Sequence, residues 1–295
     1  MTTAPTASQP ALALDVPPRL LTCTPSRLAA WLDCPRRYRF SYVDRPMPPK
    51  GPPWAHNTVG AAVHVALASW WSQPLADRTP QTAARLLRDG WAPLGFRDDQ
   101  QAAEWRERAA DMVARYVADL DPADEPVGVE RTVALKTDRL AVSGRIDRLD
   151  RRGDELVVVD YKTGRHVLST DDARGSLALA IYALAAARTM RRRCLTVELH
   201  HLPTGNVVTW QHTDQTLARQ LNRVLDIAGE AAAAVDRAAQ TGDVDAAFPP
   251  RPSQICGWCD FVDHCAEGRA AAPQRTLPWA GLPSEITSSV DEFFD

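Results

Sequence analysis

The sequence predicts an α/β fold in which helices cover a central sheet. Short apolar runs rich in β-branched residues lie between residues 127 and 211, and segments with apolar residues at helical spacing precede, separate and follow them. Two of these runs, residues 140–147 and 156–164, are joined by a turn at Arg152-Gly153-Asp154 that is short enough for an antiparallel hairpin. A chain of 295 residues with 45% hydrophobic composition can form one large or two small domains with a proper core.

Bulk composition excludes several classes of protein. The formal net charge of −3 gives no overall basic signal, so any contact with nucleic acid must come from a local patch. No run of about 18 apolar residues exists, and residues 1–18 do not resemble a secretory signal. We therefore expect a cytoplasmic protein without a membrane span, whose six cysteines favour metal ligation over disulfides.

The first ordered element is predicted to be a helix that opens at Thr24-Pro25-Ser26, with a hydroxyl cap and an early proline. It continues into a stretch where basic and aromatic residues alternate. Cations bind phosphates and rings stack on bases, so this stretch predicts a nucleic-acid-binding surface. Its candidate residues are Arg36, Arg37, Tyr38 and Arg39. The alternative is a solvated arginine face with core aromatics.

Three more helices precede the strands. The first starts near Thr58 and places Gly60 and His64 four residues apart on one face, where the glycine allows a close approach. A lone helical histidine is commonly structural, which is the alternative for His64. Residues 80–120 have apolar residues at helical spacing and predict two further core helices.

The predicted sheet begins with residues 127–135. Val127, Val129, Val133 and Leu135 are expected on one face, with Glu130 on the other. After the hairpin come a strongly apolar helix over 177–185, strands over 195–202 and 207–211, and a long alanine-rich helix over 214–239. His200 and His201 are expected to be strand residues without chemistry.

The hairpin suggests a site. Side chains alternate along a strand, so Asp160 and Lys162 share one face and Tyr161 takes the other. Asp147 can then converge with Asp160 and Lys162 at one end of the sheet. Paired carboxylates repel unless a cation lies between them, and oxygen ligands suit Mg²⁺ or Mn²⁺. The alternative is a surface hairpin with solvated charges.

The scarcity of lysine favours a chemical role for Lys162. Only three of the 34 basic residues are lysines, so an indifferent basic position in this chain would normally hold arginine. A guanidinium does not lose its proton near neutral pH, whereas the pKa of a lysine amine can be tuned.

A cysteine motif closes the predicted domain. Cys256, Cys259 and Cys265 lie within ten residues and can share one centre. Cys34 is the best candidate for a fourth ligand, because Cys23 and Cys194 lack a partner motif. Zinc, held by four cysteines or by three with His264, and an iron–sulfur cluster both fit this spacing. The remaining alternative is a set of cysteines that hold no metal. Either metal centre would link residues more than 200 positions apart and restrict the unfolded chain by about 5 kcal/mol, by analogy with disulfides.

Gly144-x-x-Asp147 followed by Val159-Asp160-Tyr161-Lys162-Thr163-Gly164 resembles the PD-(D/E)XK nuclease superfamily, and within it the RecB-like and Cas4-like exonuclease branch. The resemblance implies a restriction-endonuclease-like αβββαβ core, with a mixed central sheet flanked by helices, helical insertions and an iron–sulfur clasp. It implies that Glu130 completes the acidic cluster, that His64 faces the metal, and that the Tyr161 carbonyl is a further ligand.

The same resemblance extends to the later helix and the cysteines. Relatives carry Gln-x-x-x-Tyr in that helix, and this chain has Ala178 and Tyr182, so Tyr182 is carried over as a site residue and an amide is missing. Relatives with one cysteine before the nuclease core and three after it hold a [4Fe–4S] cluster, which favours the cluster over zinc.

The implied function is Mg²⁺- or Mn²⁺-dependent hydrolysis of DNA, with single strands or free ends as the substrate and a helicase or repair protein as a candidate partner. The alternatives are a non-catalytic iron–sulfur DNA-binding subunit of a helicase–nuclease complex and a zinc-clasped interaction module. We expect a disordered segment over 1–20, one nuclease domain over 21–268 and a tail over 269–295. That domain would comprise helices over 21–126, the sheet core over 127–212 and the last helix with the cysteine motif over 213–268.

Overall fold

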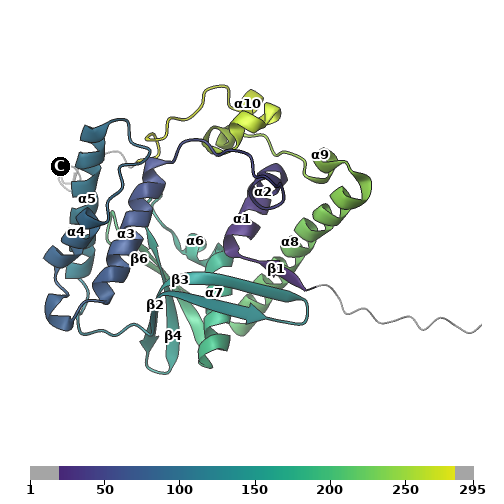
Figure 1. Ribbon diagram of the computed structural model, residues 1–295. Coiled ribbons are helices and arrows are strands. Elements are labelled where there is room, and N and C mark those ends of the chain that lie inside the picture. The colour runs from purple at the N-terminus through teal and green to yellow at the C-terminus, as the bar shows by residue number, and fades with distance from the viewer. Residues whose placement is uncertain (1–19, 283–295) are drawn as a thin grey trace, which may run out of the picture.

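A six-stranded mixed sheet organises residues 20–282, the part of the chain that the computed structural model describes (Figure 1). Its order is β1-β3-β4-β5-β6, and β2 also pairs with β3. The β1–β3 and β4–β5 pairs are parallel and the other pairs are antiparallel. The strands are β1 (Leu21–Cys23), β2 (Gly128–Lys136), β3 (Leu140–Arg152), β4 (Glu155–Lys162), β5 (Cys194–His201) and β6 (Asn206–Gln211). The predicted α/β class with a mixed central sheet is confirmed.

The β3–β4 hairpin forms as predicted. Arg152 pairs with Glu155, so Gly153 and Asp154 alone make the turn. Gly153 has φ +62°, a left-handed conformation that glycine adopts without a steric penalty. The hairpin therefore fixes the register that brings the end of β4 beside the middle of β3.

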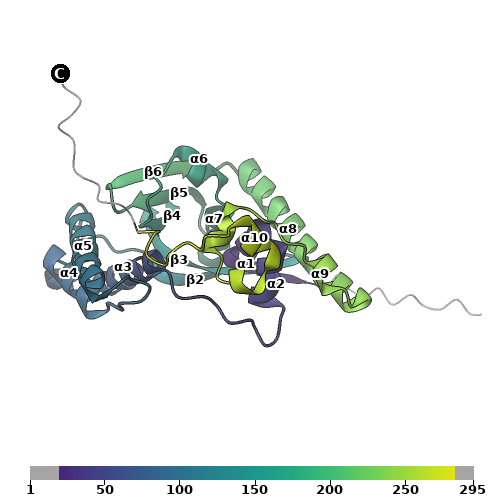
Figure 2. The same ribbon diagram turned by 90° about the horizontal axis from the view of Figure 1, so that it is seen from above.

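Helices cover both faces of the sheet. One face packs Val157 and Val159 of β4 against α3 (Ala55–Trp71), α4 (Pro80–Asp89) and α5 (Asp99–Ala118). The opposite face packs Leu156 and Val158 against α7 (Leu177–Met190). Seen from above, α3, α4 and α5 group on one side of the strands and α8 lies on the other (Figure 2). The continuous apolar run in β4 reflects burial on both faces.

The N-terminal helices pack against the long C-terminal one. The side chain of Thr24 caps α1 (Pro25–Asp33) as predicted, and α1 packs with α8 (Asp214–Thr241) and α9 (Val244–Ala247). The single helix expected from Thr24 through the basic stretch is two helices, because Cys34 is extended at φ −166° and Pro35 begins α2 (Pro35–Tyr42). The break places the Cys34 thiol at a helix junction.

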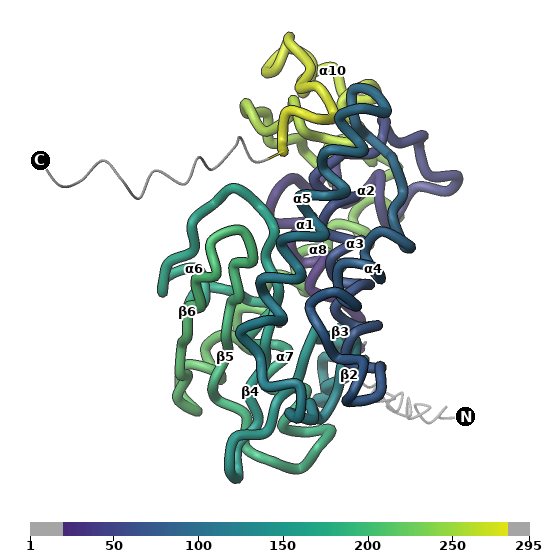
Figure 3. The backbone as a smooth tube through the Cα atoms, turned by 90° about the vertical axis from the view of Figure 1, so that its left-hand side faces the viewer, coloured from purple at the N-terminus to yellow at the C-terminus, as the bar shows by residue number. Residues whose placement is uncertain are grey.

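The cysteine-rich segment lies at the same end of the molecule as α2 (Figure 3). After it, residues 272–282 return to the start of α3, where Ala55 N donates to the Pro278 carbonyl at 3.1 Å and Leu282 is buried. The remaining elements are η1 (Leu75–Asp77), α6 (Thr170–Gly175), η2 (Gln254–Trp258), η3 (Val262–His264) and α10 (Ala266–Ala271). The expected disordered N-terminus and the extreme C-terminus lie outside the described residues. Over 20–282, no helix has the length and apolar character needed to cross a bilayer.

A buried ionic network joins β3, β5 and α5. Arg152 donates to both oxygens of Glu198 at 2.6 and 2.8 Å, and His200 Nε2 lies 3.0 Å from Glu198 Oε2. His200 Nδ1 lies 2.8 Å from the Tyr116 hydroxyl. Burial raises the pKa of the Glu198 carboxyl, but its bonds to His200 and Arg152 outweigh burial and lower it to about 2. The network therefore contains an ionised carboxylate whose charge is compensated inside the protein.

We expect Glu198→Gln to lower the free energy of unfolding at pH 7 by about 3 kcal/mol, because it leaves Arg152 and His200 without their buried partner. The pKa of Glu198 is lower in the folded state than its ordinary 4.5, so its stabilisation is complete above that pH. The difference between the two proteins should shrink as the pH falls from about 4.5 towards 2. Urea denaturation at several pH values measures this, with the half-exposed Glu155→Gln as the control, and an unchanged difference across the range would contradict it.

Candidate metal centre

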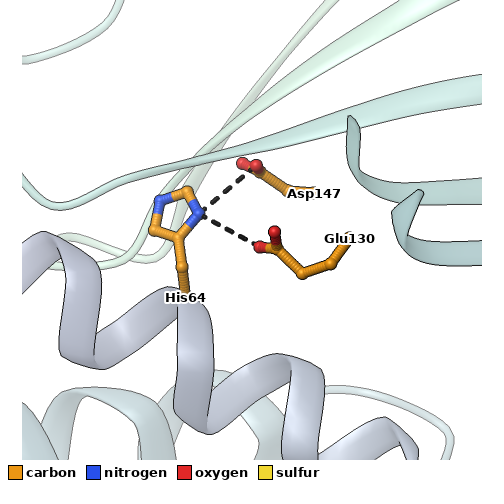
Figure 4. Close-up of side chains that lie close together, drawn as sticks. All are labelled: His64, Glu130 and Asp147. Carbon is orange, nitrogen blue, oxygen red and sulfur yellow. Dashed lines mark ion pairs between the residues drawn. The ribbon is translucent and has the colours of Figure 1, made fainter. Parts of the chain in front are cut away.

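Three side chains from three elements converge beside the sheet. His64 comes from α3, Glu130 from β2 and Asp147 from β3, and one ligand atom of each lies within 4.8 Å of the others (Figure 4). His64 Nδ1 is 3.3 Å from Asp147 Oδ1 and 3.8 Å from Glu130 Oε1. The sequence predicted all three as metal ligands, and the structure brings them together.

Gly60 allows α3 to approach the sheet. A Cβ placed on Gly60 would lie 3.3 Å from Thr163 Oγ1, which is a tight contact, so the glycine helps α3 to lie close to the end of β4. His64 lies one turn further along the same face. The spacing of this glycine and histidine therefore positions the imidazole over the site.

Glu130 reaches the site through an irregularity in β2. Its φ is +47°, a left-handed conformation that is uncommon for residues other than glycine, and it lies opposite Asp147 in the β2–β3 ladder without pairing. Val127, Val133 and Leu135 pack in the cluster around α7, but Val129 packs against α3–α5, so the prediction that these residues share a face is wrong for Val129.

Asp160 and Lys162 form a second cluster at the end of β4. Lys162 Nζ lies 2.5 Å from Asp160 Oδ2, which confirms that the two side chains share a face. The Tyr161 N–H donates to Asp147 Oδ2 at 2.8 Å and thereby holds Asp147 against β4. Asp160 is not within 4.8 Å of all three ligand atoms of the first cluster, but its charge helps to raise the pKa of His64.

The carboxylates of the site repel one another, and the pKa values of Asp160 and Glu130 are shifted. Burial raises the pKa of Asp160, and Asp147 raises it further against the effect of Lys162. Burial likewise raises the pKa of Glu130, with Arg145 and His64 opposing and Asp147 reinforcing the shift. Burial lowers the pKa of His64, but its hydrogen bond and charge interaction with Asp147 raise it overall. A divalent cation would relieve this repulsion, and the carboxylate-rich donor set fits Mg²⁺ or Mn²⁺.

Tyr182 borders the acids from α7. A Cβ on Gly144 would lie 2.4 Å from Tyr182 Cε1, so the glycine makes room for the ring. Burial, followed by the charges of Asp160 and Asp147, raises the pKa of Tyr182 to about 12. Its phenol is therefore protonated beside the site, and a role in the reaction stays a prediction.

The basic stretch of α2 is partly used in packing. Arg36 and Arg39 both pair with Asp245, at 3.4 and 2.7 Å, which ties α2 to α9. The Tyr38 ring contacts the rings of Trp31, Tyr42 and Phe248 inside an apolar cluster. Arg37 pairs with Asp33 at 2.8 Å and keeps 39% of its side chain exposed. Nucleic-acid contact by these four residues stays a prediction.

Four of the six cysteines surround one cavity of about 330 Å³ between α2 and the C-terminal segment. They are the predicted ligands Cys34, Cys256, Cys259 and Cys265. Backbone N–H groups point at three of the sulfurs, with Arg251, Ser253 and Gly268 donating at 3.3–3.4 Å. Cys23 and Cys194 are buried elsewhere, in the clusters around α1 and α7.

Sequence reasoning missed one member of the site. Arg145 Nε lies 2.7 Å from Glu130 Oε2. Its position two residues before Asp147 on the same strand was a usable signal, because side chains two apart share a face of a strand.

A mixed sheet between helices, with a histidine–carboxylate cluster beside an Asp–Lys pair, defines an α/β protein with a candidate metal site on its sheet. Residues 22–266 match the family model of the PD-(D/E)XK nuclease superfamily, and the chain belongs to this superfamily, as its motifs predicted. The fold is accordingly of the restriction-endonuclease-like type, and nucleases of this superfamily use divalent metals.

Solved structures resemble the chain only distantly. A candidate exonuclease from Eubacterium rectale has 12% identity and a TM-score of 0.49, covering 87% of this chain and 93% of its own. A structure titled SSO0001 has 13% identity and a TM-score of 0.38, covering 86% of this chain and 90% of its own. No curated protein matches the sequence.

Proposed function

We propose that this protein is a metal-dependent deoxyribonuclease that hydrolyses phosphodiester bonds at the centre formed by His64, Glu130, Asp147, Asp160 and Lys162. One observation carries the proposal. The His64–Glu130–Asp147 cluster, which could hold a metal ion, lies beside the ion pair in which Lys162 Nζ is 2.5 Å from Asp160 Oδ2. An ordinary surface hairpin would leave these charges solvated and apart, whereas Asp147 and Asp160 are largely buried.

The residues divide into two roles. His64, Glu130, Asp147, Asp160 and the Tyr161 carbonyl would hold one or two Mg²⁺ or Mn²⁺ ions, which neutralise charge on the phosphate and the leaving oxygen. Lys162 positions the water whose oxygen attacks phosphorus, as the bond from phosphorus to the 3′ oxygen breaks. Asp160 holds the Lys162 ammonium in place through their ion pair.

We infer that the substrate is DNA with single-stranded or free ends, that the protein acts in repair or recombination in the cytoplasm, and that a helicase or repair protein is its partner. The support is the resemblance to the RecB-like branch over Gly144–Asp147 and Val159–Gly164.

We also infer that Cys34, Cys256, Cys259 and Cys265 hold a [4Fe–4S] cluster. The support is the resemblance to relatives with the same cysteine layout, together with a cavity of about 330 Å³ that the four cysteines line and that has room for more than a single ion. Anaerobic purification followed by measurement of iron content and of absorbance at about 400 nm tests this inference.

Digestion of labelled DNA tests the nuclease itself. We expect cleavage with Mg²⁺ or Mn²⁺ and none with EDTA, on single-stranded rather than blunt double-stranded substrates. Asp147→Asn should lower the rate by at least about 100-fold, since even residues that only support metal ligands contribute 10–100-fold.

Asp154→Asn is the matched control, because it removes the same charge from a fully exposed turn of the same hairpin. Equal rates for the wild type and both variants would overturn the proposal. Metal-independent binding of DNA without cleavage would instead support the non-catalytic subunit, which the missing amide at Ala178 favours.

A further inference from the structure

Arg145 is a cation at the rim of the metal centre to which the reaction described above gives no role. Its side chain is 69% exposed, yet its Nε lies 2.7 Å from Glu130 Oε2. Lys162, the other cation of the site, is instead paired with Asp160. Each cation thus accompanies a different carboxylate.

The two oxygens of Glu130 face different partners. Oε1 lies 3.8 Å from His64 Nδ1, on the side of the predicted metal ligands, whereas Oε2 contacts Arg145. This arrangement depends on the left-handed backbone of Glu130, which turns the carboxylate between α3 and β3. Glu130 can therefore serve a metal ion and an arginine from one position.

A metal ion and Arg145 compete for the charge of Glu130. A divalent cation among His64, Glu130 and Asp147 draws on the same carboxylate and repels the guanidinium. The Arg145 side chain is mostly exposed to solvent, so its ion pair with Glu130 is weak. Once a metal ion neutralises Glu130, Arg145 is free to leave it.

A guanidinium has five N–H donors in a planar fork that matches the oxygens of a phosphate. The side chains of Arg145 and Lys162 are 69% and 45% exposed, so both cations of the site face the solvent from which a nucleic-acid strand would approach. Once released from Glu130, the Arg145 guanidinium would lie beside the phosphate that is cleaved or beside a neighbouring phosphate of the same strand.

We propose that Arg145 is a substrate-binding residue: it pairs with Glu130 before metal binds and contacts a phosphate of the nucleic-acid strand afterwards. The proposal rests on the proposed nuclease function and names a further residue of that site. If it is correct, Arg145→Ala should tighten metal binding and weaken substrate binding. Loss of a purely structural arginine would not produce these two opposite effects.

The first arm measures Mn²⁺ binding without nucleic acid, by calorimetry or electron paramagnetic resonance. Arg145→Ala should tighten Mn²⁺ binding about 2- to 5-fold, the range expected for loss of one exposed ion pair. Arg151→Ala is the matched control, since it removes an exposed arginine from the far end of the same strand. Unchanged or weaker Mn²⁺ binding by Arg145→Ala would overturn the competition.

The second arm measures single-stranded DNA binding with Mn²⁺ in the Lys162→Ala background, which keeps all the metal ligands. Adding Arg145→Ala should weaken binding and reduce the slope of log K against log salt by about 0.7, the value for one phosphate contact to a single strand. Arg145→Lys should keep most of the slope because it keeps the charge. An unchanged slope in Arg145→Ala would overturn the phosphate contact.

The two arms separate this inference from the nuclease proposal. Neither requires cleavage, so both can succeed in a protein that proves inactive. Conversely, full loss of cleavage in Asp147→Asn together with wild-type behaviour of Arg145→Ala in both arms would leave the nuclease intact and remove Arg145 from substrate binding.

Discussion

Lys162→Ala is expected to lower the rate of DNA cleavage by about 10²- to 10⁴-fold, the usual contribution of a group that positions or activates the attacking molecule. Lys162 Nζ is held 2.5 Å from Asp160 Oδ2 at the end of β4, and Asp160 also interacts with Asp147. Loss of the amine removes the group beside the attacked phosphorus and leaves the metal ligands in place. Mn²⁺ binding by Lys162→Ala should therefore be at least as tight as that of the wild type, because Asp160 loses a cation that competes with the metal ion.

Arginine should not replace this lysine. The guanidinium is larger, and its donors lie in a rigid planar fork, so it cannot place a single N–H where the Lys162 ammonium positions the water. We expect Lys162→Arg to stay near the rate of Lys162→Ala, which single-turnover cleavage with excess enzyme would measure. Lys136→Ala is the matched control, because Lys136 is exposed at the end of β2. Near-wild-type cleavage by Lys162→Arg would show that this position supplies charge alone.

Patterns that belong to a single strand or helix were predictable from the sequence. Alternation placed Asp160 beside Lys162, the short turn at Gly153 set the hairpin, and the Gly60–His64 spacing placed the imidazole over the sheet. Each of these depends on local geometry, which residue type and spacing largely determine.

Features that depend on tertiary context were not predictable in the same way. Glu130 has a left-handed φ although it is neither glycine nor asparagine, so its residue type does not predict this conformation. The irregularity breaks the alternation of side chains from which Val129 was assigned to the wrong face. The pairing of Arg36 and Arg39 with Asp245 joins segments about 200 residues apart, so a stretch with the composition of a nucleic-acid surface is partly engaged in packing. Local composition does not report such distant partners.

Cys256→Ala is expected to remove the cysteine-bound group and to destabilise the start of α3 as well. Trp258 lies between Cys256 and Cys259, and its ring is 5.2 Å from that of Trp54, the residue that precedes α3. The Trp54 indole N–H donates to Asp260 Oδ1 at 2.9 Å, so a second bond ties the cysteine segment to the same point. His64 lies on this helix, less than three turns further along.

The thermal effect should be large, because the four cysteines connect α2 to a segment more than 200 residues later. A link over such a loop restricts the unfolded chain by about 5 kcal/mol in the disulfide analogy, and 1 kcal/mol corresponds to about 2–4 °C for a domain of this size. We therefore expect Cys256→Ala to lower the melting temperature by about 10 °C or more and to abolish the absorbance at about 400 nm. Cys23→Ala, a buried cysteine outside the cavity, should keep the absorbance.

The same variant tests whether the two centres are coupled. If the cysteine segment holds the start of α3, its release should also weaken Mn²⁺ binding at His64, measured well below the lowered melting temperature. Trp258→Ala should reproduce part of this weakening while retaining iron, because it removes the ring contact with Trp54 and leaves all four thiols. Mn²⁺ binding that stays at the wild-type value in both variants would show that α3 is positioned by its packing on α5 and β4 alone.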